Sequence, residues 1–348
     1  MHHLFYVENG ISLALVIGYI KEKKISHDCT TILLGRRQKA EVSYKTKDIS
    51  SWEFRTSANF LKGWAKTKRI ENEINDFLNA ENIIEYRFYT SSISKLSCYF
   101  LLMHSKNKGN CFIEDGRSAY YTEEEFRAYI KEFHFSSLAY PLFQLKCWLN
   151  YRLKHYPNPN NTIKFIKKTN NAIVSSEYSL TYIKNKHIVS NLFKNTDTDY
   201  HDIQCLMCLS YPVEDGLIEL ENYKQVLIKT FNYAVGQGIS EIHYKFHPQQ
   251  LSNPKNLDTY LKVINSFNNR ISFIELPRET IMETVMSNSN ALLLSDYSSI
   301  MIYTANFGNK IISNFGLIQA NSTTKKRMPL LPQVLTSIIH KSNIPLSL

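Results

Sequence analysis

The sequence predicts a parallel α/β fold made of two doubly wound, Rossmann-like domains. Short apolar runs alternate with longer stretches of helical periodicity along most of the chain. A length of 348 residues is enough for two domains, each with its own core. The composition is 43% hydrophobic and 21% charged, which is ordinary for a globular protein and excludes the collagen, coiled-coil and disordered classes.

In the first half, a strand is expected at 3–7, followed by a turn at Asn9-Gly10 and a helix that runs to Lys24. Further strands are expected at 31–35, 83–89 and 110–113, with helices at 60–78 and 94–103. Thr122 with an acid three residues later, at Glu125, has the pattern of a capping box. That pattern predicts another helix from this point.

The second half repeats a strand–loop–helix unit more regularly. Strands are expected at 203–209, 241–246, 271–275, 291–295 and 310–314. Helices are expected at 221–235, 257–267 and 279–287, and from Ser298 onward. Because doubly wound sheets bind ligands at the carboxyl ends of their strands, we expect the chemistry in the loops that follow these strands. The polar stretch 195–201 predicts a boundary between domains at 1–195 and 196–325, and the remainder, 326–348, is expected to hold a C-terminal helix.

Charge is unevenly distributed along the chain. There are 41 Lys and Arg against 31 Asp and Glu, a formal net charge of +10. The segment 141–195 holds nine basic residues and one acid, and 297–348 holds five basic residues and no acid. Such patches favour an anionic partner, either a phosphate-rich substrate, a lipid headgroup or a nucleic acid. A solvated basic face that only aids solubility is the alternative.

The sequence also bears on location. No apolar run reaches the roughly 20 residues that a membrane span needs. The apolar stretch 11–20 has no Lys or Arg before it and no small-residue cleavage site after it, so a signal peptide is not expected. The six cysteines are scattered and are expected in the core. We therefore expect a cytoplasmic protein, with a peripheral position on the cytoplasmic face of the inner membrane as the alternative.

Two motifs stand at predicted strand ends in the second half. In Lys245-Phe246-His247-Pro248, the proline ends the strand and restricts the backbone of the histidine. In Ser295-Asp296-Tyr297-Ser298-Ser299, consecutive serines at a helix N-terminus offer hydroxyl and N–H groups to a phosphate. A surface histidine and simple N-capping by Asp296 or Ser298 are the alternatives without a ligand.

Acidic motifs occur at three places. Glu114-Asp115-Gly116 follows the predicted strand at 110–113, and a carboxylate in such a tight turn is a candidate general base. Glu214-Asp215-Gly216 repeats the pattern in the second half and is the second choice, as a donor-side loop. Asp197-Thr198-Asp199 has the Asp-x-Asp spacing of some metal sites, but it lies in the predicted linker, so no metal site is expected there.

Three of these motifs, taken in order, resemble those of the bacterial sialyltransferases of the GT-B fold, including the lipooligosaccharide sialyltransferases and capsular polysialyltransferases. The matching residues are the acidic-acidic-Gly motif Glu114-Asp115-Gly116, the His-Pro motif His247-Pro248 and the Ser-Ser motif Ser298-Ser299. The resemblance covers most of the chain in organisation and about a dozen residues in its specific motifs. It implies two Rossmann-like domains facing a central cleft, with the acceptor side at 1–195 and the CMP-sugar side at 196–325. The C-terminal helix could then pack back on the N-terminal domain.

The resemblance implies an inverting, metal-independent enzyme without a cofactor. It would move a sialic acid or related nonulosonic acid from its CMP conjugate to a glycan hydroxyl of a surface polysaccharide or lipooligosaccharide. Glu114 is the first choice as the general base and Asp115 the second. His247 would stabilise or protonate the departing phosphate, acting best as an imidazolium. Glu275 would hold the ribose, and the full donor-binding set is Lys245, Pro248, Glu275, Tyr297, Ser298, Ser299, Gly116, Asn9 and Gly10.

Several alternatives stay open. The sugar on CMP could be pseudaminic acid, legionaminic acid or Kdo, and a GT-B enzyme that uses a UDP-sugar is a further option. The basic, aromatic stretch 133–156 fits a core helix, an interfacial membrane helix, or a channel for an anionic or lipid-linked glycan acceptor. A non-enzymatic protein that binds nucleic acid or membrane through its basic patches is the remaining hypothesis, although no nucleic-acid-binding motif supports it.

Overall fold

The computed structural model describes residues 1–35, 42–52, 60–91, 95–134, 169–190, 192–193, 200–278, 280–324 and 328–346. The chain divides into two units, Met1–Leu192 and Phe193–Leu348. This division lies close to the boundary expected at 195–196.

The first unit is built on a seven-stranded sheet in which every neighbouring pair is parallel. The strand order is β3-β2-β1-β4-β5-β6-β7. Since the chain builds outward from β1 in one direction and then returns to build from β4 in the other, this is the doubly wound order, with its switch point between β1 and β4. The strands are β1 His2–Val7, β2 Thr30–Leu34, β3 Lys45–Asp48, β4 Tyr86–Thr90, β5 Asn107–Ile113, β6 Asn171–Val174 and β7 Asn185–Ile188.

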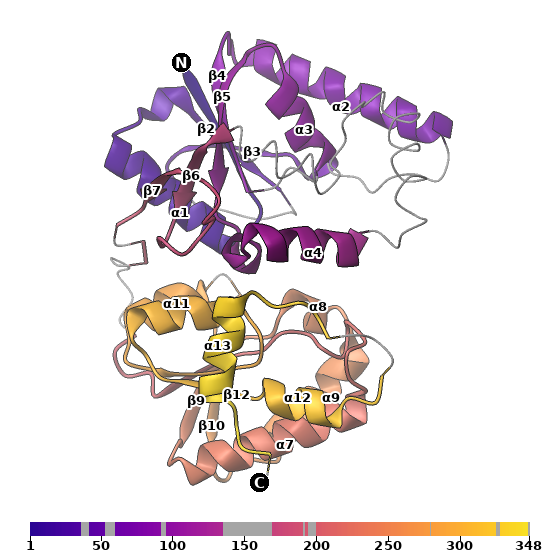
Figure 1. Cartoon of the computed structure of the whole chain (residues 1–348), viewed down its shortest axis with the longest axis vertical. Coiled ribbons are helices and arrows are strands. Elements are labelled where there is room, and N and C mark those ends of the chain that lie inside the picture. Colours follow the sequence, from indigo (N-terminus) through magenta and orange to yellow (C-terminus); the bar gives the residue numbers. More distant parts are fainter. Residues whose placement is uncertain are drawn as a thin grey trace. The chain divides into compact units, whose positions relative to one another are not determined.

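Helices cover both faces of this sheet, and Figure 1 shows α1 on one side with α2 and α3 on the other. Alternate residues of β1 explain the arrangement, because successive side chains of a strand point to opposite faces. Leu4 and Tyr6 join the core under α2 and α3, whereas the ring of Phe5 lies 6.4 Å from that of Tyr19 in α1. The helices are α1 Gly10–Lys23, α2 Phe60–Ala80, α3 Leu96–Met103 and α4 Glu123–His134, with short 3₁₀ turns at His27–Cys29, Ser50–Trp52 and Gly116–Tyr120.

The helix α1 packs closely on the segment that follows β7, and Gly18 makes this possible. A Cβ added at Gly18 would lie 2.4 Å from Cγ1 of Val189, far inside van der Waals contact. The absence of a side chain therefore sets how near α1 can approach this part of the first unit.

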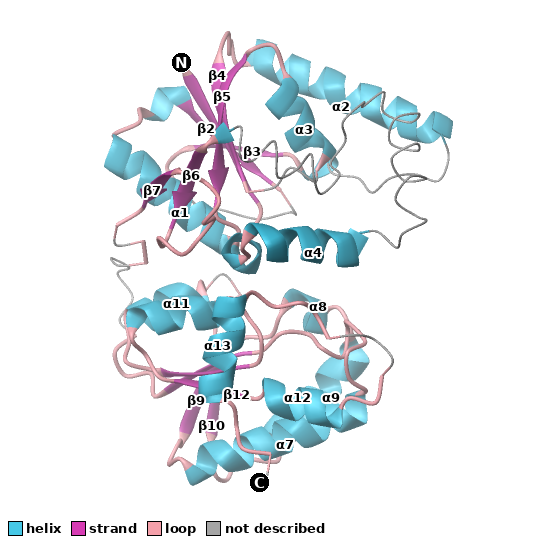
Figure 2. Cartoon of the chain, viewed as in Figure 1, coloured by secondary structure: helices cyan, strands magenta, loops and turns pink. Residues whose placement is uncertain are grey.

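The second unit repeats the same design on a smaller scale. Its five strands are all parallel, in the order β10-β9-β8-β11-β12, so the switch point lies between β8 and β11. The strands are β8 Cys205–Cys208, β9 Glu241–Tyr244, β10 Ser272–Glu275, β11 Leu292–Ser295 and β12 Ile311–Ser313. The helices are α7 Leu220–Gly236, α8 Pro248–Leu251, α9 Pro254–Asn265, α10 Met282–Ser287, α11 Ile300–Phe307, α12 Phe315–Asn321 and α13 Gln333–Ser342. Figure 2 shows the strands of each unit enclosed by its helices.

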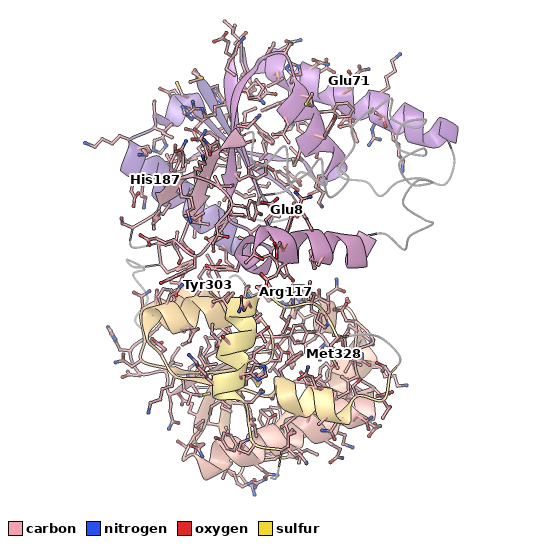
Figure 3. The ribbon with its side chains drawn as sticks, in the orientation of Figure 1. Glu8, Glu71, Arg117, His187, Tyr303 and Met328 are labelled. Atoms are coloured by element: carbon pink, nitrogen blue, oxygen red, sulfur yellow. The ribbon has the colours of Figure 1, made fainter. Side chains whose placement is uncertain are left out.

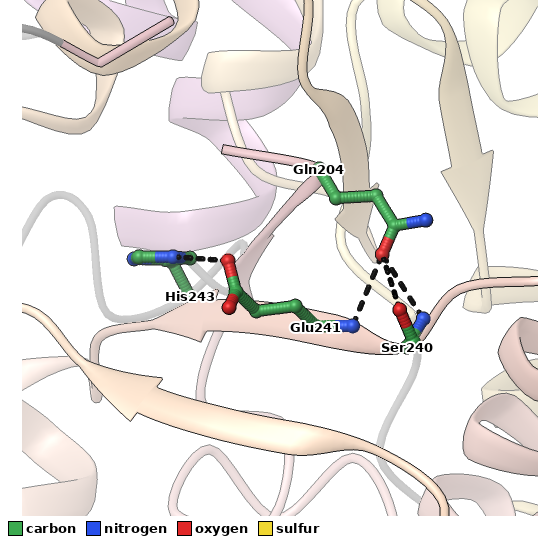
Figure 4. Close-up of polar contacts among 4 residues, drawn as sticks. All are labelled: Gln204, Ser240, Glu241 and His243. Carbon is green, nitrogen blue, oxygen red and sulfur yellow. Dashed lines mark hydrogen bonds and ion pairs between the residues drawn. The ribbon is translucent and has the colours of Figure 1, made fainter. Parts of the chain in front are cut away.

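A buried core in the second unit joins one face of the sheet to α7, α9 and α12. At the amino ends of β8 and β9, a single side chain also connects neighbouring strands. Oε1 of Gln204 accepts hydrogen bonds from the backbone N–H groups of Ser240 and Glu241, both at 3.0 Å (Figure 4). This contact fixes how the two strands start relative to each other.

The C-terminal helix α13 packs against α11 and β12 of the second unit. Beyond it, the backbone N–H of Ile344 donates to the carbonyl of Ser313 at 2.8 Å, and Asn343 forms a parallel bridge with Ser313. Packing of this helix on the N-terminal domain stays a prediction.

The expected α/β class with two Rossmann-like domains is confirmed. Each strand and helix that the sequence predicts within the described residues is present, with ends that differ by up to three residues. The predicted cap of α4 is also present, because the N–H of Thr122 donates to Glu125 and the N–H of Glu125 donates to Oγ1 of Thr122. The central cleft between domains stays a prediction.

Three strands, β3, β6 and β7, were not expected. β3 and β7 form the edges of the first sheet, and their Lys- and Asn-containing sequences are mostly exposed. An edge strand can be short and polar because only one of its sides is paired, so it carries little apolar signal. Of the stretch 133–156, only Phe133 and His134, at the end of α4, fall within the described residues. Among the described helices, none is long and apolar enough to cross a membrane.

Candidate functional site

In the first unit, the predicted acidic motif follows β5, close to the switch point. Glu114 is fully buried. Its carboxylate accepts hydrogen bonds from the backbone N–H of Ser175 at 2.7 Å, from Oγ of Ser175 at 2.9 Å and from the hydroxyl of Tyr120 at 2.9 Å. Ser175 directly follows β6, so Glu114 ties the carboxyl ends of β5 and β6 together. Glu114 is therefore a structural carboxylate, because it is buried away from solvent and its oxygens are hydrogen-bonded within the protein.

Asp115 lies in a different environment from Glu114. It is half-exposed and precedes the 3₁₀ turn Gly116–Tyr120. Gly116 has a φ of +57°, a left-handed conformation that glycine adopts without the cost that other residues incur. The Nδ2 group of Asn9 donates a hydrogen bond to Oδ1 of Asp115. Geometry thus favours Asp115, the second choice from the sequence, as the carboxylate that can meet a ligand.

Asn9 and Gly10 lie where the sequence placed them, at the carboxyl end of β1 and the start of α1. Asn9 is the N-cap of α1, and Oδ1 of its side chain accepts from the N–H of Ser12 at 2.8 Å. The structure therefore brings two predicted residues together, Asn9 and Asp115, which are 106 positions apart in the sequence.

Sequence reasoning missed a charged pair beside them. Glu8, labelled in Figure 3, directly follows β1 and is 5% exposed. Its Oε2 lies 3.9 Å from Nζ of Lys95, the N-cap residue of α3. Glu8 directly follows β1, and Lys95 lies between β4 and α3, so the pair belongs to the two strands that border the switch point. A carboxylate directly after a predicted strand was the available signal, since that is where ligands bind in doubly wound folds.

In the second unit, Asp296 joins the two strands that border the switch point. It follows β11 and is fully buried. Its carboxylate accepts from the N–H of Ser210 and from Oγ of Ser210, both at 2.7 Å, and from the N–H of Tyr297 at 2.5 Å. Burial raises the pKa of Asp296, and the hydrogen bonds from Ser210 and Tyr297 oppose that rise. Asp296 thus acts as a brace between the loops after β8 and β11.

His247 occupies the N-cap position of α8, with Pro248 as the first helical residue. Its ring atom Nδ1 accepts from the backbone N–H of Gln249 at 3.2 Å, and the backbone N–H of His247 donates to Oε1 of Gln250 at 2.9 Å. Because Nδ1 is an acceptor here, the proton of the neutral ring lies on Nε2. The ring also stacks on Tyr211, with centroids 4.2 Å apart and planes inclined by 28°.

The charge state of His247 differs from the expected one. Burial, with a further contribution from the nearby Lys245 cation, lowers the pKa of His247 to about 4. The imidazole is therefore neutral near pH 7 in the protein without ligand, and it offers Nε2–H as a hydrogen-bond donor. The sequence could not show this, because neither the burial of the ring nor its use as a cap is visible in a His-Pro pair.

Lys245 lies close to several polar groups of the second unit. Its Nζ donates to the carbonyl of Thr280 at 2.7 Å. Burial raises the pKa of the partly buried Glu283, and Lys245 opposes that rise. Burial likewise raises the pKa of the Cys208 thiol to about 12, with Glu283 and Asp296 adding to the effect. Cys208 is therefore a protonated thiol rather than a nucleophile. Glu283 was missed because it lies inside the short helix α10 rather than at a strand end.

The Ser-Ser motif stands at the amino end of α11. Ser298 and Ser299 are half-exposed, and Ser299 is the N-cap residue of the helix without a side-chain capping bond. Tyr297 is buried, and its ring lies 5.3 Å from that of Phe315. The two serines can thus present hydroxyl and N–H groups, whereas Tyr297 contributes to packing.

Glu275 and the second acidic motif have separate locations. Glu275 is exposed at the end of the edge strand β10, which β9 separates from β8. Oε1 of Glu214 accepts from Nδ2 of Asn256 and from the hydroxyl of Tyr260, both at 3.0 Å. Since both partners belong to α9, Glu214 anchors its loop to that helix, and Gly216 turns the chain with a φ of +68°. Asp215 lies between them in the same turn.

Within the described parts of the chain, no group of three or more His, Cys, Asp or Glu side chains is placed to hold a metal ion. Asp197 and Asp199 lie outside the described residues, as does most of the basic segment 141–195.

No protein-family model matches the sequence, and no curated protein sequence matches it. Solved structures are similar over nearly the whole chain at low identity. UDP-GlcNAc 2-epimerase from Methanocaldococcus jannaschii, in complex with UDP-GlcNAc and UDP, is 11% identical with a TM-score of 0.49, covering 98% of this chain and 99% of that one. UDP-GlcNAc 2-epimerase from Neisseria meningitidis, bound to UDP-GlcNAc, is 14% identical with a TM-score of 0.47, covering 98% and 91%. UGT71G1 from Medicago truncatula, complexed with UDP-glucose, is 8% identical with a TM-score of 0.46, covering 97% and 89%.

The class of the protein is set by its own strand order. It is an α/β protein of two Rossmann-like units, each with polar residues gathered at the switch point of an all-parallel sheet.

Proposed function

We propose that the protein is an inverting glycosyltransferase that moves a sialic acid, or a related nonulosonic acid, from its CMP conjugate to a glycan hydroxyl. The observation that carries the proposal is the placement of three motifs. Asp115 follows β5, His247 follows β9 and Ser298-Ser299 follow β11, so each stands at the carboxyl end of a parallel strand within its own unit. Surface polysaccharide or lipooligosaccharide is the proposed acceptor class, on the resemblance alone.

In the proposed reaction, the Asp115 carboxylate takes the proton of the acceptor hydroxyl as its oxygen attacks the anomeric carbon. The bond between that carbon and the phosphate oxygen of CMP breaks, so the configuration inverts and CMP leaves. The charge that develops on the phosphate is stabilised by hydrogen bonds from Nε2–H of His247 and from the Ser298 and Ser299 groups at the start of α11. The products are the new glycoside, CMP and a proton on Asp115.

A neutral His247 changes the role proposed for it. A ring with a pKa of about 4 donates a hydrogen bond at pH 7 without carrying a charge. The donor arrives as a phosphodiester with one negative charge, and CMP leaves as a phosphate monoester that carries a second one. This growing charge would favour the imidazolium, because an opposite charge stabilises the charged form. The ring therefore suits a phosphate that becomes more negative during the reaction, and it avoids a permanent cation next to Lys245.

Nucleotide binding and sugar transfer test the proposal. Calorimetry with CMP, UDP and GDP should show a preference for CMP that weakens at least tenfold in His247→Ala. His340→Ala, which removes an exposed histidine of α13, is the matched control and should bind as wild type does. Preference for UDP would instead support a UDP-sugar enzyme, the class of ligand that the similar solved structures hold.

The catalytic assignment needs its own comparison. Asp115→Asn should lower kcat by about 100-fold or more with normal folding, since a positioned general base contributes about 10²–10⁴. Glu114→Gln should instead lower the melting temperature, because its new amide N–H₂ opposes the donors of Ser175 and Tyr120. If no CMP is released from CMP-sialic acid, CMP-pseudaminic acid, CMP-legionaminic acid or CMP-Kdo with any glycan acceptor, the proposal is wrong.

A further inference from the structure

Asn9 has a side chain with two different ends, and each end has its own partner. The carbonyl oxygen Oδ1 accepts from the N–H of Ser12, 2.8 Å away, and caps α1. Oγ of Ser12 accepts in return from the N–H of Asn9 at 3.3 Å, completing a capping box. The amide group Nδ2 points to Oδ1 of Asp115, which follows a strand two positions away in the sheet.

The orientation of this amide follows from its partners. The N–H of Ser12 is a donor and requires the oxygen, whereas the Asp115 carboxylate is an acceptor and requires the N–H₂ group. A flipped amide would lose both contacts, so the assignment is fixed by chemistry on both sides. An alanine or leucine N-cap would supply neither contact, and serine or aspartate would supply the cap alone.

We propose that Asn9 is a positioning residue that orients the Asp115 carboxylate from the helix cap of α1. The inference rests on the proposed function, in which Asp115 is the general base. A carboxylate held by a donor on a capped helix keeps one rotamer, and general-base efficiency depends on that alignment with the acceptor hydroxyl. The donor-binding role that the sequence suggested for Asn9 stays a separate prediction.

Charged groups on the neighbouring elements form a common background. They are Glu8 after β1, Lys95 at the start of α3, Glu114 beside Asp115 and Arg117 in the 3₁₀ turn. All four are present in every variant below, so differences between variants report on Asn9 itself. Two substitutions of Asn9 keep the cap and change the group that faces Asp115, and a third substitution, at Ser12, is the control.

Asn9→Ser keeps an oxygen for the cap and removes the donor to Asp115. We expect a melting temperature within about 2 °C of wild type, a kcat about 10–100-fold lower and a nearly unchanged KM for the CMP-sugar. Asn9→Asp also keeps the cap, but places a second carboxylate against Asp115. Like charges favour protonation, so the acidic limb of its kcat profile should move up by about one pH unit.

Ser12→Ala is the matched control. It removes the Oγ half of the capping box and leaves both contacts of the Asn9 side chain in place. It should lower the melting temperature slightly and leave kcat and its pH profile unchanged. If Asn9 had a purely structural role, Asn9→Ser and Ser12→Ala would have the same kcat once folded.

A readout without turnover distinguishes failure of this inference from failure of the proposed function. Carboxyl ¹³C NMR of aspartate-labelled protein, with the Asp115 signal assigned from Asp115→Asn, should show a higher titration midpoint in Asn9→Ser than in wild type, since a donor to the charged form is lost. If that shift appears but no sugar is transferred, the positioning contact stands and the function is wrong. If sugar is transferred while kcat stays within twofold and the midpoint does not move, the inference about Asn9 is overturned.

Discussion

Ser210 and Asp296 are 86 positions apart, yet they share two hydrogen bonds of 2.7 Å, one from the N–H and one from Oγ of Ser210. These bonds join the loops after β8 and β11 at the switch point of the second sheet. Hydrogen bonds to a charged group contribute about 1.5–3 kcal/mol, and a buried donor that loses its partner costs about 1–3 kcal/mol.

Asp296→Ala should lower the free energy of unfolding by about 3 kcal/mol or more, because it leaves the N–H groups of Ser210 and Tyr297 without their acceptor. Ser210→Ala, which keeps its backbone bond, should cost about 1–2 kcal/mol. Urea unfolding followed by circular dichroism measures both. The control is Ser240→Ala, since Oγ of Ser240 makes a 3.3 Å exposed bond to Gln204. Equal losses for the two serine variants would contradict this account.

The low pKa of His247, about 4, predicts how stability depends on pH. An unfolded histidine protonates near pH 6.5, so the unfolded state takes up this proton first as the pH falls. The stability from neutral His247 is complete above about pH 6.5 and is lost as the pH falls toward 4. Between pH 7.5 and 5, wild type should lose about 1–2 kcal/mol more than His247→Asn.

The matching experiment is a series of urea titrations at several pH values. His340→Asn should follow the wild-type pH dependence, because that side chain is exposed. Histidine NMR adds a direct test, in which CMP should raise the midpoint of His247 and Lys245→Met should raise it in the free protein. A midpoint near 6.5 in the free wild-type protein would contradict the neutral ring.

Glu214 should matter for stability and not for turnover. Glu214→Ala removes the acceptor of Asn256 and Tyr260, with an expected loss of about 2 kcal/mol in the free energy of unfolding. Its kcat for CMP-sugar transfer should stay within threefold of wild type at a temperature where the variant is folded. A 100-fold loss of kcat with normal stability would contradict this expectation and make Glu214 a candidate general base.

Gly18 predicts a pair of coupled substitutions. Gly18→Ala should destabilise the first unit by about 1–3 kcal/mol, since the new Cβ would overlap Cγ1 of Val189. In the double variant with Val189→Ala, the methyl group that clashes is gone, so the added cost of Gly18→Ala should largely vanish. Gly236→Ala is the control, because an added Cβ there meets no atom within 4 Å. Additive losses in the double variant would contradict the close contact.

Much of the fold could be predicted from the sequence, for a physical reason. Central strands such as β1 and β8 are buried on both faces, so they must be apolar runs that stand out between polar loops. Edge strands such as β3 have no such requirement, and they were missed. The locations of Asp115 and His247 at strand ends could also be predicted, because both follow recognisable strands.

The environment of each site residue could not be predicted. Glu114 and Asp115 look equivalent in the sequence. Only the tertiary contact with Ser175 shows that Glu114 is the buried acid and Asp115 the half-exposed one. The neutral state of His247 depends mainly on the burial of its ring, which stacks on Tyr211 from the loop after β8, and the sequence does not show that contact. The contact between Asn9 and Asp115 joins two loops across an intervening strand, and no local pattern encodes it.

The bridge between Ser313 and Asn343 has a consequence for biosynthesis. The edge strand β12 is completed by residues 343–344, so the second sheet lacks part of its hydrogen bonding until that segment has left the ribosome. The first unit, Met1–Leu192, contains its whole sheet and can fold earlier, during translation. A nascent chain stalled after about residue 325 should therefore resist protease in its first unit while its second unit is still digested. Premature termination in α13 should accordingly give a protein with one folded half.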